Sequence, residues 1–333
     1  MLDVRRLRLL RDLAHLGTIA AVAEAHSYTP SAVSQQLAVL ERESGVPLLR
    51  PTGRRVTLTS AGKVLVRHAE TILAELERAS AALTAARTGL SGPLRIGAFP
   101  TAVRTLLPDA LVALGREHPG LELMVSEMDP ALVPDAVRDR RLDVGLMHDY
   151  DVAPVQPDRT LDAVPLLDET VYLAVPAAAG GTTVAGTDPI RAVRDAAWIV
   201  GTPGTLCHTV ALRLCETAGF TPQVRHHADD FATVLALVAA GQGVSLVPQL
   251  AAAQPPAEVR LVPLSTRRRT RIGYRRGAGD HPAVAAAVAA IRTSTSAHLA
   301  AASINFMAMP DFMTMPGAPR RPASPTAPAG SGQ

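Results

Sequence analysis

The feature that most constrains this chain is a long segment without proline, residues Ser60 to Arg87, in which apolar residues follow a heptad repeat. Alternating steps of four and three separate the members of the repeat, which are Leu65, Ala69, Ile72, Leu76, Ala79 and Leu83. A helix of this length with a 3.5-residue period presents a narrow apolar seam that a second helix can cover. We therefore expect a dimer through this helix. Packing of the seam on its own domain is the alternative that the pattern leaves open.

The segment before this helix predicts three short helices and a hairpin. Leucines at three-residue steps indicate an amphipathic helix over Val4 to Leu16, and threonines placed as N-caps begin further helices over Ile19 to Ala25 and Pro30 to Ser44. Residues 48–59 predict two short strands around a basic Thr-Gly tip. Three helices followed by such a hairpin are typical of a winged helix-turn-helix, which binds DNA.

Charge and side-chain chemistry agree with a DNA-binding module. Residues 1–67 hold ten basic against five acidic residues, in a chain of 333 residues whose formal net charge is +3. The third helix turns a short row of hydroxyl and amide groups outward, and such groups can bind base edges or phosphates, while arginines on the hairpin suit the phosphate backbone or the minor groove. A solvated hairpin is the alternative for the wing. The candidate DNA contacts are Thr29, Ser31, Ser34, Gln35 and Gln36 on the helix and Arg50, Arg54 and Arg55 on the hairpin.

After a Gly-Leu-Ser-Gly-Pro linker the chain alternates strands and helices in two sets. Such alternation predicts a parallel sheet with helices on its faces, and two sets predict two lobes with a cleft between them. The first set includes a helix over Arg104 to His118, and the second begins with a strand over Tyr172 to Pro176. Ligands of open α/β sheets bind beyond the carboxyl ends of strands. The candidate cleft residues are therefore Phe99, Pro100, Thr101, His148, Thr202, Pro203, Thr205, His227 and Asp229, although each alone also suits a structural role.

Both halves of the chain resemble one protein family. The run GTIAAVAEAHSYTPSAVSQQLAVLERESGVPLLRPTGRRVTLTSAG is similar to the DNA-binding domain of the LysR family, with His26 standing where the family usually has a buried leucine. The strings GPLRIGAFPTAVRTLLPDAL, LDVGLM and LVAAGQGVSLVP resemble the effector-binding domain of that family, which is similar to periplasmic solute-binding proteins. The resemblance covers residues 1 to about 300. Thr101 matches a position where the family often has a ligand-binding serine or threonine.

The resemblance implies an α/β protein with an all-α N-terminal winged helix-turn-helix, a long linker helix and a two-lobed effector domain. The expected divisions are a DNA-binding domain over 1–60, a dimerisation helix over 61–90, an effector domain over 91–300 and a disordered tail over 301–333. Lobe I would comprise 91–167 with 268–300, and lobe II 168–267. The chain would cross between lobes near Pro165 to Tyr172 and near Pro263 to Thr270, and a helix over Pro282 to Ala300 would return to lobe I.

The implied function is regulation of transcription. The expected partners are double-stranded promoter DNA, a small-molecule effector, further copies of the chain in a dimer or tetramer, and RNA polymerase. No 18-residue uncharged apolar run is present, and the N-terminus is charged, so we expect a cytoplasmic protein without a membrane span. The 32 arginines against one lysine suggest a GC-rich genome.

The sequence leaves four other interpretations to consider. Cys207 and Cys215 are the two cysteines and could form a redox switch, since peroxide-sensing members of the family also carry paired cysteines in this region. The cluster His208, His226 and His227 could bind a metal, but its spacing fixes no tetrahedral set, so we expect no metal and no cofactor. An enzyme is disfavoured because no catalytic motif is present. A free solute-binding protein is disfavoured by the N-terminal module.

Overall fold

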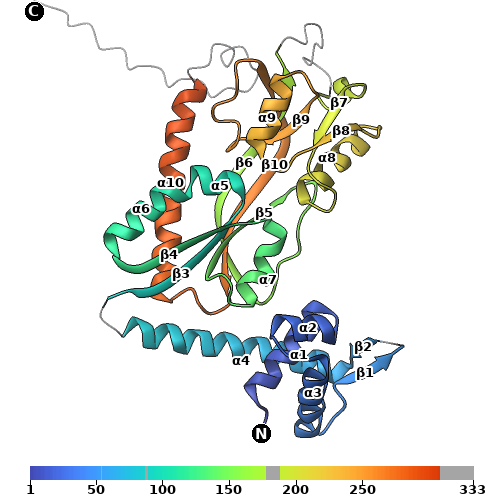
Figure 1. The fold of residues 1–333 in the computed structure, drawn as a ribbon, viewed down its shortest axis with the longest axis vertical. Helices are drawn as coiled ribbons and strands as arrows, with labels where there is room; N and C mark the ends of the chain where they lie inside the picture. Colours follow the sequence, from blue (N-terminus) through green and yellow to red (C-terminus); the bar gives the residue numbers. More distant parts are fainter. Residues whose placement is uncertain (54, 87–88, 178–187, 308–333) are drawn as a thin grey trace, which may run out of the picture.

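The structure, a computed structural model, describes residues 1–53, 55–86, 89–177 and 188–307. An N-terminal helical module leads through one long helix into a larger α/β domain (Figure 1). Three sequence expectations fall outside the described residues, namely the wing contact at Arg54, the side chain of Arg55 and the tail from residue 308 onward. The boundary expected at residue 301 is wrong, because the helix expected over Pro282 to Ala300 continues to Met307. None of the described helices is long and apolar enough to span a bilayer.

The N-terminal module forms as the sequence predicts. Its elements are α1 (Val4–Leu16), α2 (Ile19–Ala25), α3 (Pro30–Ser44), β1 (Leu49–Thr52) and β2 (Arg55–Leu58), followed by α4 (Ser60–Ala85). Side chains cap the helix N-termini, and Gly17 and Gly45 end α1 and α3 with φ of 76° and 71°, a left-handed conformation that glycine adopts without strain. The fully buried leucines of α1 and α3 form one core with the start of α4. The expected bounds of α1, α2 and α3 are confirmed. They could be predicted because the capping residues and the apolar periodicity that define each helix are local features of the sequence.

The α/β domain is built on a six-stranded sheet in the order β4-β3-β5-β10-β6-β9, with a separate pair β7-β8. These strands are β3 (Ser91–Ala98), β4 (Gly120–Glu127), β5 (Val144–Tyr150), β6 (Leu161–Pro176), β7 (Ala197–Val200), β8 (Gln223–His227), β9 (Ser245–Pro248) and β10 (Val259–Arg275). The helices are α5 (Pro100–Thr105), α6 (Leu107–Glu117), α7 (Val133–Arg138), α8 (Leu206–Thr217), α9 (Phe231–Ala239) and α10 (Pro282–Met307), with short 3-10 turns at Pro130–Leu132 and Arg191–Val193.

The sheet is mixed, and the expectation of a purely parallel sheet is wrong. β3 pairs in parallel with β4 and β5, whereas β10 pairs antiparallel with both β5 and β6. Strand alternation predicted only the local βαβ units, because β6 and β10 lie about 100 residues apart in the sequence and their pairing has no local signal.

Two further boundaries differ from expectation. The helix predicted over 104–118 divides at Leu106 into α5 and α6, where Pro108 follows in the first turn of α6, and the strand predicted at 172 begins at Leu161.

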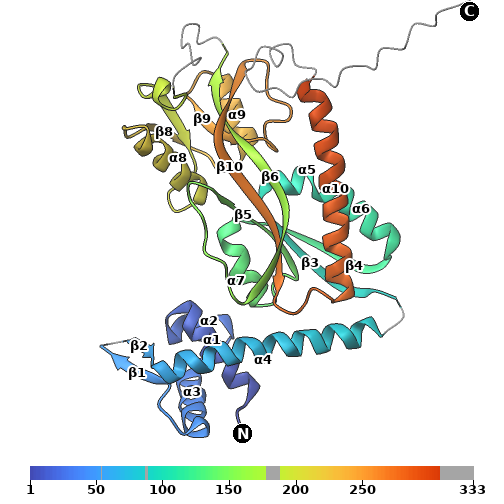
Figure 2. The same ribbon diagram turned by 180° about the vertical axis from the view of Figure 1, so that it is seen from behind.

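β6 and β10 carry the chain between the two lobes. They are 16 and 17 residues long and run side by side through both lobes (Figure 2). The crossings expected near 165–172 and 263–270 lie inside these strands, and the register of the pair shifts between Pro263 and Arg267. The two lobes therefore share a continuous pair of strands as their hinge.

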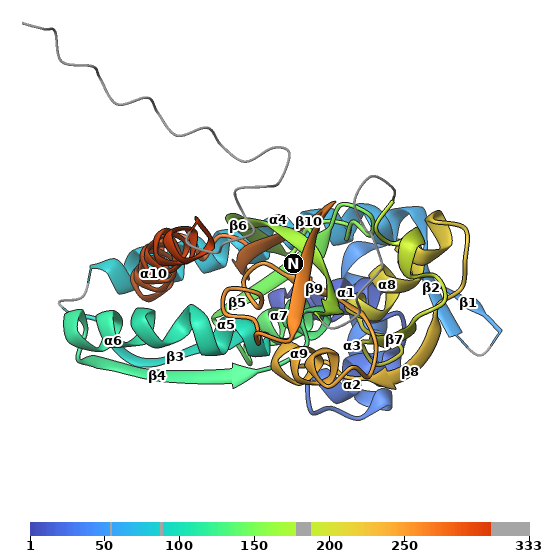
Figure 3. The same ribbon diagram turned by 90° about the horizontal axis from the view of Figure 1, so that it is seen from above.

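Each lobe has its own apolar core. In lobe I the sheet packs against α6 and α10, with Leu107, Leu114 and Ile291 fully or almost fully buried. In lobe II α9 packs on β6 and β9, and Trp198 lies in a second cluster with Cys215. Viewed from above, α6 and α10 stand at one end of the domain and α8 with β7 and β8 at the other (Figure 3). The hinge strands lie between these two bodies.

Candidate DNA-binding surface and effector cleft

The outer face of α3 carries the five predicted DNA contacts, and all five are exposed. Thr29 is the N-cap, where its Oγ1 accepts a hydrogen bond from the Ala32 amide at 3.2 Å. Gln36 is held in place by α1, because the Nε of Arg6 donates to its Oε1 at 2.9 Å and the Arg6 guanidinium also pairs with Glu43. The face is thus a row of hydroxyl and amide groups with one member already oriented.

The wing is tied to the end of α3. The amides of Leu48 and Leu49 donate to the Glu41 carboxylate at 2.8 and 2.9 Å, which fixes the entry to β1. Arg50 is exposed on β1, and its Nε donates to Thr57 Oγ1 on β2 at 3.2 Å. A Cβ at Gly62 would lie 2.2 Å from the Leu48 carbonyl oxygen, so this glycine lets α4 begin directly beneath the wing.

A buried carboxylate that the sequence reading missed joins α1 to the turn after α2. Asp12 is 2 % exposed, the Nε2 of His26 lies 2.7 Å from its Oδ2, and the Arg11 Nε donates to its Oδ1 at 2.7 Å. Burial would raise the pKa of Asp12, but the His26 and Arg11 contacts outweigh burial and lower it. His26 therefore replaces an apolar contact with a polar one. Its partner, Asp12, lies on a different helix, so the sequence alone carried no signal for this pair.

Helix α4 presents two apolar faces. One face, with Val66, Ala69, Leu73 and Ala74, is buried against the chain itself. The other carries the second half of the predicted heptad seam, where Ile72, Leu76 and Leu83 are 37, 47 and 74 % exposed and Ala79 is also exposed. Packing on the chain itself thus applies to one face of the helix, while dimer formation through the exposed half of the seam stays a prediction.

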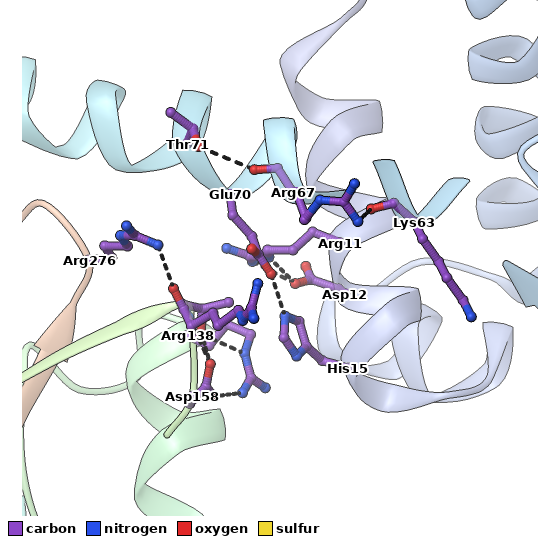
Figure 4. Close-up of polar contacts among 12 residues, drawn as sticks. Arg11, Asp12, His15, Lys63, Arg67, Glu70, Thr71, Arg138, Asp158 and Arg276 are labelled. Carbon is purple, nitrogen blue, oxygen red and sulfur yellow. Dashed lines mark hydrogen bonds and ion pairs between the residues drawn. The ribbon is translucent and has the colours of Figure 1, made fainter. Parts of the chain in front are cut away.

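A polar junction joins the DNA-binding module to lobe I (Figure 4). The figure shows side chains of α1, α4 and α7 converging: His15 Nε2 lies 3.6 Å from Glu70 Oε1, and Arg138 pairs with Asp158. Nearby, Glu77 of α4 pairs with Arg140 and, at 3.4 Å, with Arg275 of β10. Glu77 of α4 thus pairs with two arginines of the α/β domain, whereas Glu70 pairs with α1.

The same junction is closed by a backbone contact. A Cβ at Gly277, which has a φ of +85°, would lie 2.3 Å from the carbonyl oxygen of Ala74 on α4. Arg8 of α1 also lines the junction, and its pKa is lowered by burial and by the nearby charges of Arg140 and Arg11. Charged side chains and one close backbone contact therefore hold α4 against the α/β domain at this junction.

The effector cleft lies between the lobes, above β5 and β10. Its cavity measures about 270 Å³. Lobe I contributes Phe99, Pro100, Thr101, Glu127, Met128, Asp129, Pro130 and, from β5, His148; lobe II contributes Thr205, Leu206, Cys207, Asp229 and Phe231; and the hinge strand β10 contributes Arg268. A second cavity of about 580 Å³ adjoins it and shares Pro130, His148, Thr205 and Leu206. An ion pair between Arg104 of α5 and Asp230 at the start of α9, at 2.9 Å, bridges the two lobes.

The floor of the cleft holds a buried charge. Arg268 is fully buried, its Nε donates to Glu169 Oε1 at 2.7 Å, and its guanidinium carbon lies 4.9 Å from the centre of the Phe99 ring. Burial would lower the pKa of Arg268, but Glu169, Tyr150 and Cys207 together outweigh burial and raise it. His148 lies edge-on to the same ring at 4.9 Å, and burial together with Arg268 lowers its pKa well below its ordinary value. The floor thus combines a permanent cation with a neutral imidazole.

Six of the nine predicted cleft residues line the cavity: Phe99, Pro100, Thr101, His148, Thr205 and Asp229. The other three lie outside its lining. Thr202 holds Asp229, donating from its amide at 2.8 Å and from its hydroxyl at 2.6 Å, and Pro203 follows it in the same exposed loop. The Nδ1 of His227 lies 3.1 Å from the Gly201 carbonyl oxygen instead.

The sequence reading missed Arg268, Cys207 and Asp129 as cleft residues. Arg268 sits in the basic run of β10 at the lobe crossing, which was the one available signal. Cys207 lines the cleft with its Sγ 3.6 Å from the Tyr150 hydroxyl, while Cys215 is buried in the lobe II core. In the part of the chain that the structure describes, no group of three or more His, Cys, Asp or Glu side chains could hold a metal ion.

Two family models match the chain. Residues 4–63 match the bacterial regulatory helix-turn-helix protein, lysR family, and residues 87–296 match the LysR substrate binding domain. The chain belongs to the LysR family of transcriptional regulators. It therefore combines a DNA-binding helix-turn-helix with an effector-binding domain, as the sequence predicted.

Similar proteins agree with this assignment. The chain is 32 % identical over 252 residues to a Mycobacterium avium protein named as a probable hydrogen peroxide-inducible genes activator, covering 74 % of this chain and 77 % of that protein. It is 28 % identical over 253 residues to the transcriptional dual regulator GltC of Bacillus subtilis, with coverage of 74 and 81 %. Among solved structures, an OxyR mutant of Corynebacterium glutamicum is 24 % identical with a TM-score of 0.54, covering 91 % of this chain and 96 % of that one, and shares the fold.

Proposed function

We propose that this LysR-family regulator binds promoter DNA as a dimer and adjusts that binding when a small molecule occupies the cleft between its lobes. One observation carries the proposal: a single chain joins an exposed row of base-reading side chains on α3 to a cleft whose floor holds a buried, incompletely paired arginine. A protein that works on promoter DNA acts in the bacterial cytoplasm.

The DNA contacts follow from the exposed face of α3 and the wing beside it. Ser31, Ser34, Gln35 and Gln36 would lie in the major groove, where amides pair with adenine edges and hydroxyls serve bases or phosphates. Arg50, together with Arg54 and Arg55, would neutralise phosphates and so make the affinity depend on salt. Thr29 would position the N-terminus of α3 on the backbone.

Dimer formation would use the exposed seam of α4. Ile72, Leu76, Ala79 and Leu83 lie on one face over more than two turns, and pairing of two such faces buries them. A symmetric dimer presents two recognition helices to an inverted repeat, and two dimers would form a tetramer on DNA. RNA polymerase is a further partner of a regulator bound at a promoter.

The junction gives the cleft a route to the DNA-binding module. Closing of the lobes would shift lobe I relative to α4, and the contacts of Glu77 with Arg140 and Arg275 would break or form in response. A coupling free energy of about 1–3 kcal/mol is sufficient for a regulatory change. We propose that the cleft binds its ligand without converting it.

A redox-sensing regulator is the second candidate, favoured by relatives that are named as peroxide-inducible activators. In this chain burial raises the pKa of the Cys207 thiol, and burial raises the pKa of Cys215 to about 12. Because the thiolate is the species that reacts with peroxides, these two thiols are poorly suited to sensing at neutral pH. The metabolite-binding function is therefore the one that the cleft supports.

The test measures binding of the full-length protein to the duplex upstream of its own gene, by fluorescence anisotropy at increasing salt concentrations. Arg50→Ala should weaken binding to every sequence and reduce the salt slope by about one. Arg194→Ala, an exposed arginine of lobe II, is the matched control and should leave the slope unchanged. An unchanged slope in Arg50→Ala would remove this arginine from the DNA contacts.

The cleft is tested separately. A metabolite that raises the melting temperature of the protein should also change its affinity for the duplex, and Thr101→Val should remove that response, because Thr101 is a buried hydroxyl of the cavity wall. Micromolar peroxide should leave the affinity unchanged. If peroxide changes the affinity and Cys207→Ser abolishes the change, the redox function replaces the one proposed.

A further inference from the structure

The charges around the cleft are arranged with opposite signs on its floor and on its walls. The floor holds the guanidinium of Arg268, while Asp129 of lobe I and Asp229 of lobe II line the walls. All three charges act on the thiol of Cys207. Burial raises the pKa of this thiol and the Tyr150 contact lowers it. In addition, Arg268 lowers the pKa, whereas Asp129 and Asp229 raise it. One cation and these two carboxylates therefore surround one small space, and a third carboxylate, Glu127 at the end of β4, also lines the cavity.

The cation on the floor has unused capacity. Arg268 is 0 % exposed, and its Nε donates to Glu169 Oε1, while Nη2 forms an ion pair with the same oxygen at 2.7 Å. Among the described residues neither Nη1 nor Nη2 has a hydrogen-bond partner. A buried donor without a partner costs free energy, and native proteins rarely leave one unsatisfied. His148 adds a further such atom, since its Nδ1 is also without a partner within the described ranges and its side chain lines the same cavity. An acceptor group of a ligand would satisfy Arg268.

The two wall carboxylates come from different lobes. Asp129 accepts a hydrogen bond from the Ala131 amide at 2.7 Å, and Asp229 is held by Thr202. Each carboxylate oxygen can accept more than one hydrogen bond, so both retain capacity toward the cleft. Two like charges on opposite lobes repel each other when the lobes approach, and a cation between them would remove that cost.

We infer that the effector is a small zwitterion, an α-amino acid or a close analogue, whose carboxylate binds Arg268 and whose ammonium group binds between Asp129 and Asp229. The inference rests on the proposed function and names the chemical class of its ligand. The adjoining cavity of about 580 Å³ borders the cleft and leaves room for the side chain of the amino acid. Binding would draw the lobes together, because the ligand contacts both of them and the hinge.

The experiment is a thermal-shift screen of the full-length protein with the twenty L-amino acids, followed by calorimetry on those that raise the melting temperature. Each such amino acid is compared with its amide, which lacks the carboxylate, and with its N-acetyl derivative, which lacks the ammonium group. The inference predicts that at least one amino acid binds and that either derivative binds about tenfold more weakly or worse.

Isosteric variants assign the two contacts. Asp129→Asn keeps an acceptor oxygen for the Ala131 amide, and Asp229→Asn keeps one for the Thr202 amide, while the Thr202 hydroxyl can turn to accept from the new side-chain amide. Each variant should weaken binding of the amino acid about tenfold while affecting binding of its N-acetyl derivative little. Because Arg268→Gln alone leaves Glu169 unpaired, the floor is tested in the double variant R268Q/E169Q, which should lose the amino acid and keep its fold by circular dichroism. Asp195→Asn, on the surface of lobe II with a side chain 93 % exposed, is the matched control.

Three results would overturn the inference: no amino acid binds, a derivative with one charge binds as tightly as its parent, or the aspartate variants bind like the control. DNA binding is measured on the same samples. A protein that binds its upstream duplex with the expected salt dependence but fails these tests rejects the zwitterion alone, whereas a protein without affinity for any duplex rejects the proposed function.

Discussion

The DNA-binding module and the effector domain differ in how far apart in the sequence the residues of their sites lie. The surface of α3 comes from one run of residues, 29–36, and its neighbours in the wing follow within about twenty positions. The cleft draws its residues from six separate segments between Phe99 and Arg268. The first site is a property of one amphipathic helix, while the second exists only after β6 and β10 have paired.

The difference determines what a substitution does in each region. A change on α3 or in its cap acts locally, through a helix end or a contact with DNA. A change on the cleft floor acts on the hinge, because Arg268 and Glu169 belong to the two strands that both lobes share. We therefore expect large effects on folding from the floor and smaller, more specific effects from α3.

The largest expected effect is that of Arg268→Gln. Removing the guanidinium leaves the carboxylate of Glu169, which is 1 % exposed, without its counter-charge, and loss of one partner of a buried pair costs about 3–5 kcal/mol. Urea unfolding measures the loss, and R268Q/E169Q should recover most of it. If the single variant loses less than about 1 kcal/mol, the hinge does not depend on this pair and the contrast between the two regions fails.

The next effect is on DNA recognition. Gln36→Ala should cost about 1–3 kcal/mol of binding free energy on the specific duplex and little on an unrelated one, because the lost group reads bases. Its orientation depends on Arg6, so Arg6→Ala should lose part of the same specificity. Anisotropy on both duplexes measures the difference. Equal losses on the two duplexes would assign Gln36 to the backbone instead.

Ionisation of the buried His148 should make the stability of the protein depend on pH. Since burial lowers the pKa of His148, the folded protein keeps the ring neutral where the unfolded chain, with a pKa near 6.5, takes up a proton. This contribution to stability is complete above about pH 6.5 and is lost as the pH falls, with a slope of at most about 1.4 kcal/mol per unit. His15 and His281 shift in the same direction, so wild type must be compared with His148→Gln. Identical slopes would contradict the assignment.

The smallest effect is that of Thr29→Ala at the start of α3. The hydroxyl satisfies one amide of the helix, and its loss should cost about 1 kcal/mol of unfolding free energy. Thr29→Ser keeps the acceptor and serves as control. A loss several times larger would mean that this threonine supports more than its own helix.

These contrasts also explain how far the sequence could be interpreted. The bounds of α1, α2 and α3 follow from leucine spacing and from capping residues within a few positions, so local sequence signals were enough to predict them. The antiparallel pairing of β10 with β6 depends on residues about 100 positions apart, so a parallel sheet was predicted wrongly.

The same limit applies to the cleft. Thr101 was predicted because it follows a strand, and it lies in the cavity wall. Arg268 was missed because an arginine in a basic strand is usually exposed, and only the pairing of β10 with β6 brings it beside Glu169 and buries it. His227 was predicted from its place before α9, yet its side chain contacts the Gly201 carbonyl rather than the cavity.

The central claim is that the polar face of α3, with the arginines beside it, holds this protein on DNA. The most direct measurement is the affinity of the full-length protein for the duplex upstream of its own gene between 50 and 200 mM salt. The account predicts specific binding that weakens about 10³- to 10⁵-fold over this range, as expected for six to ten phosphate contacts. An affinity that does not change with salt, or no affinity for the duplex at any salt, would contradict it.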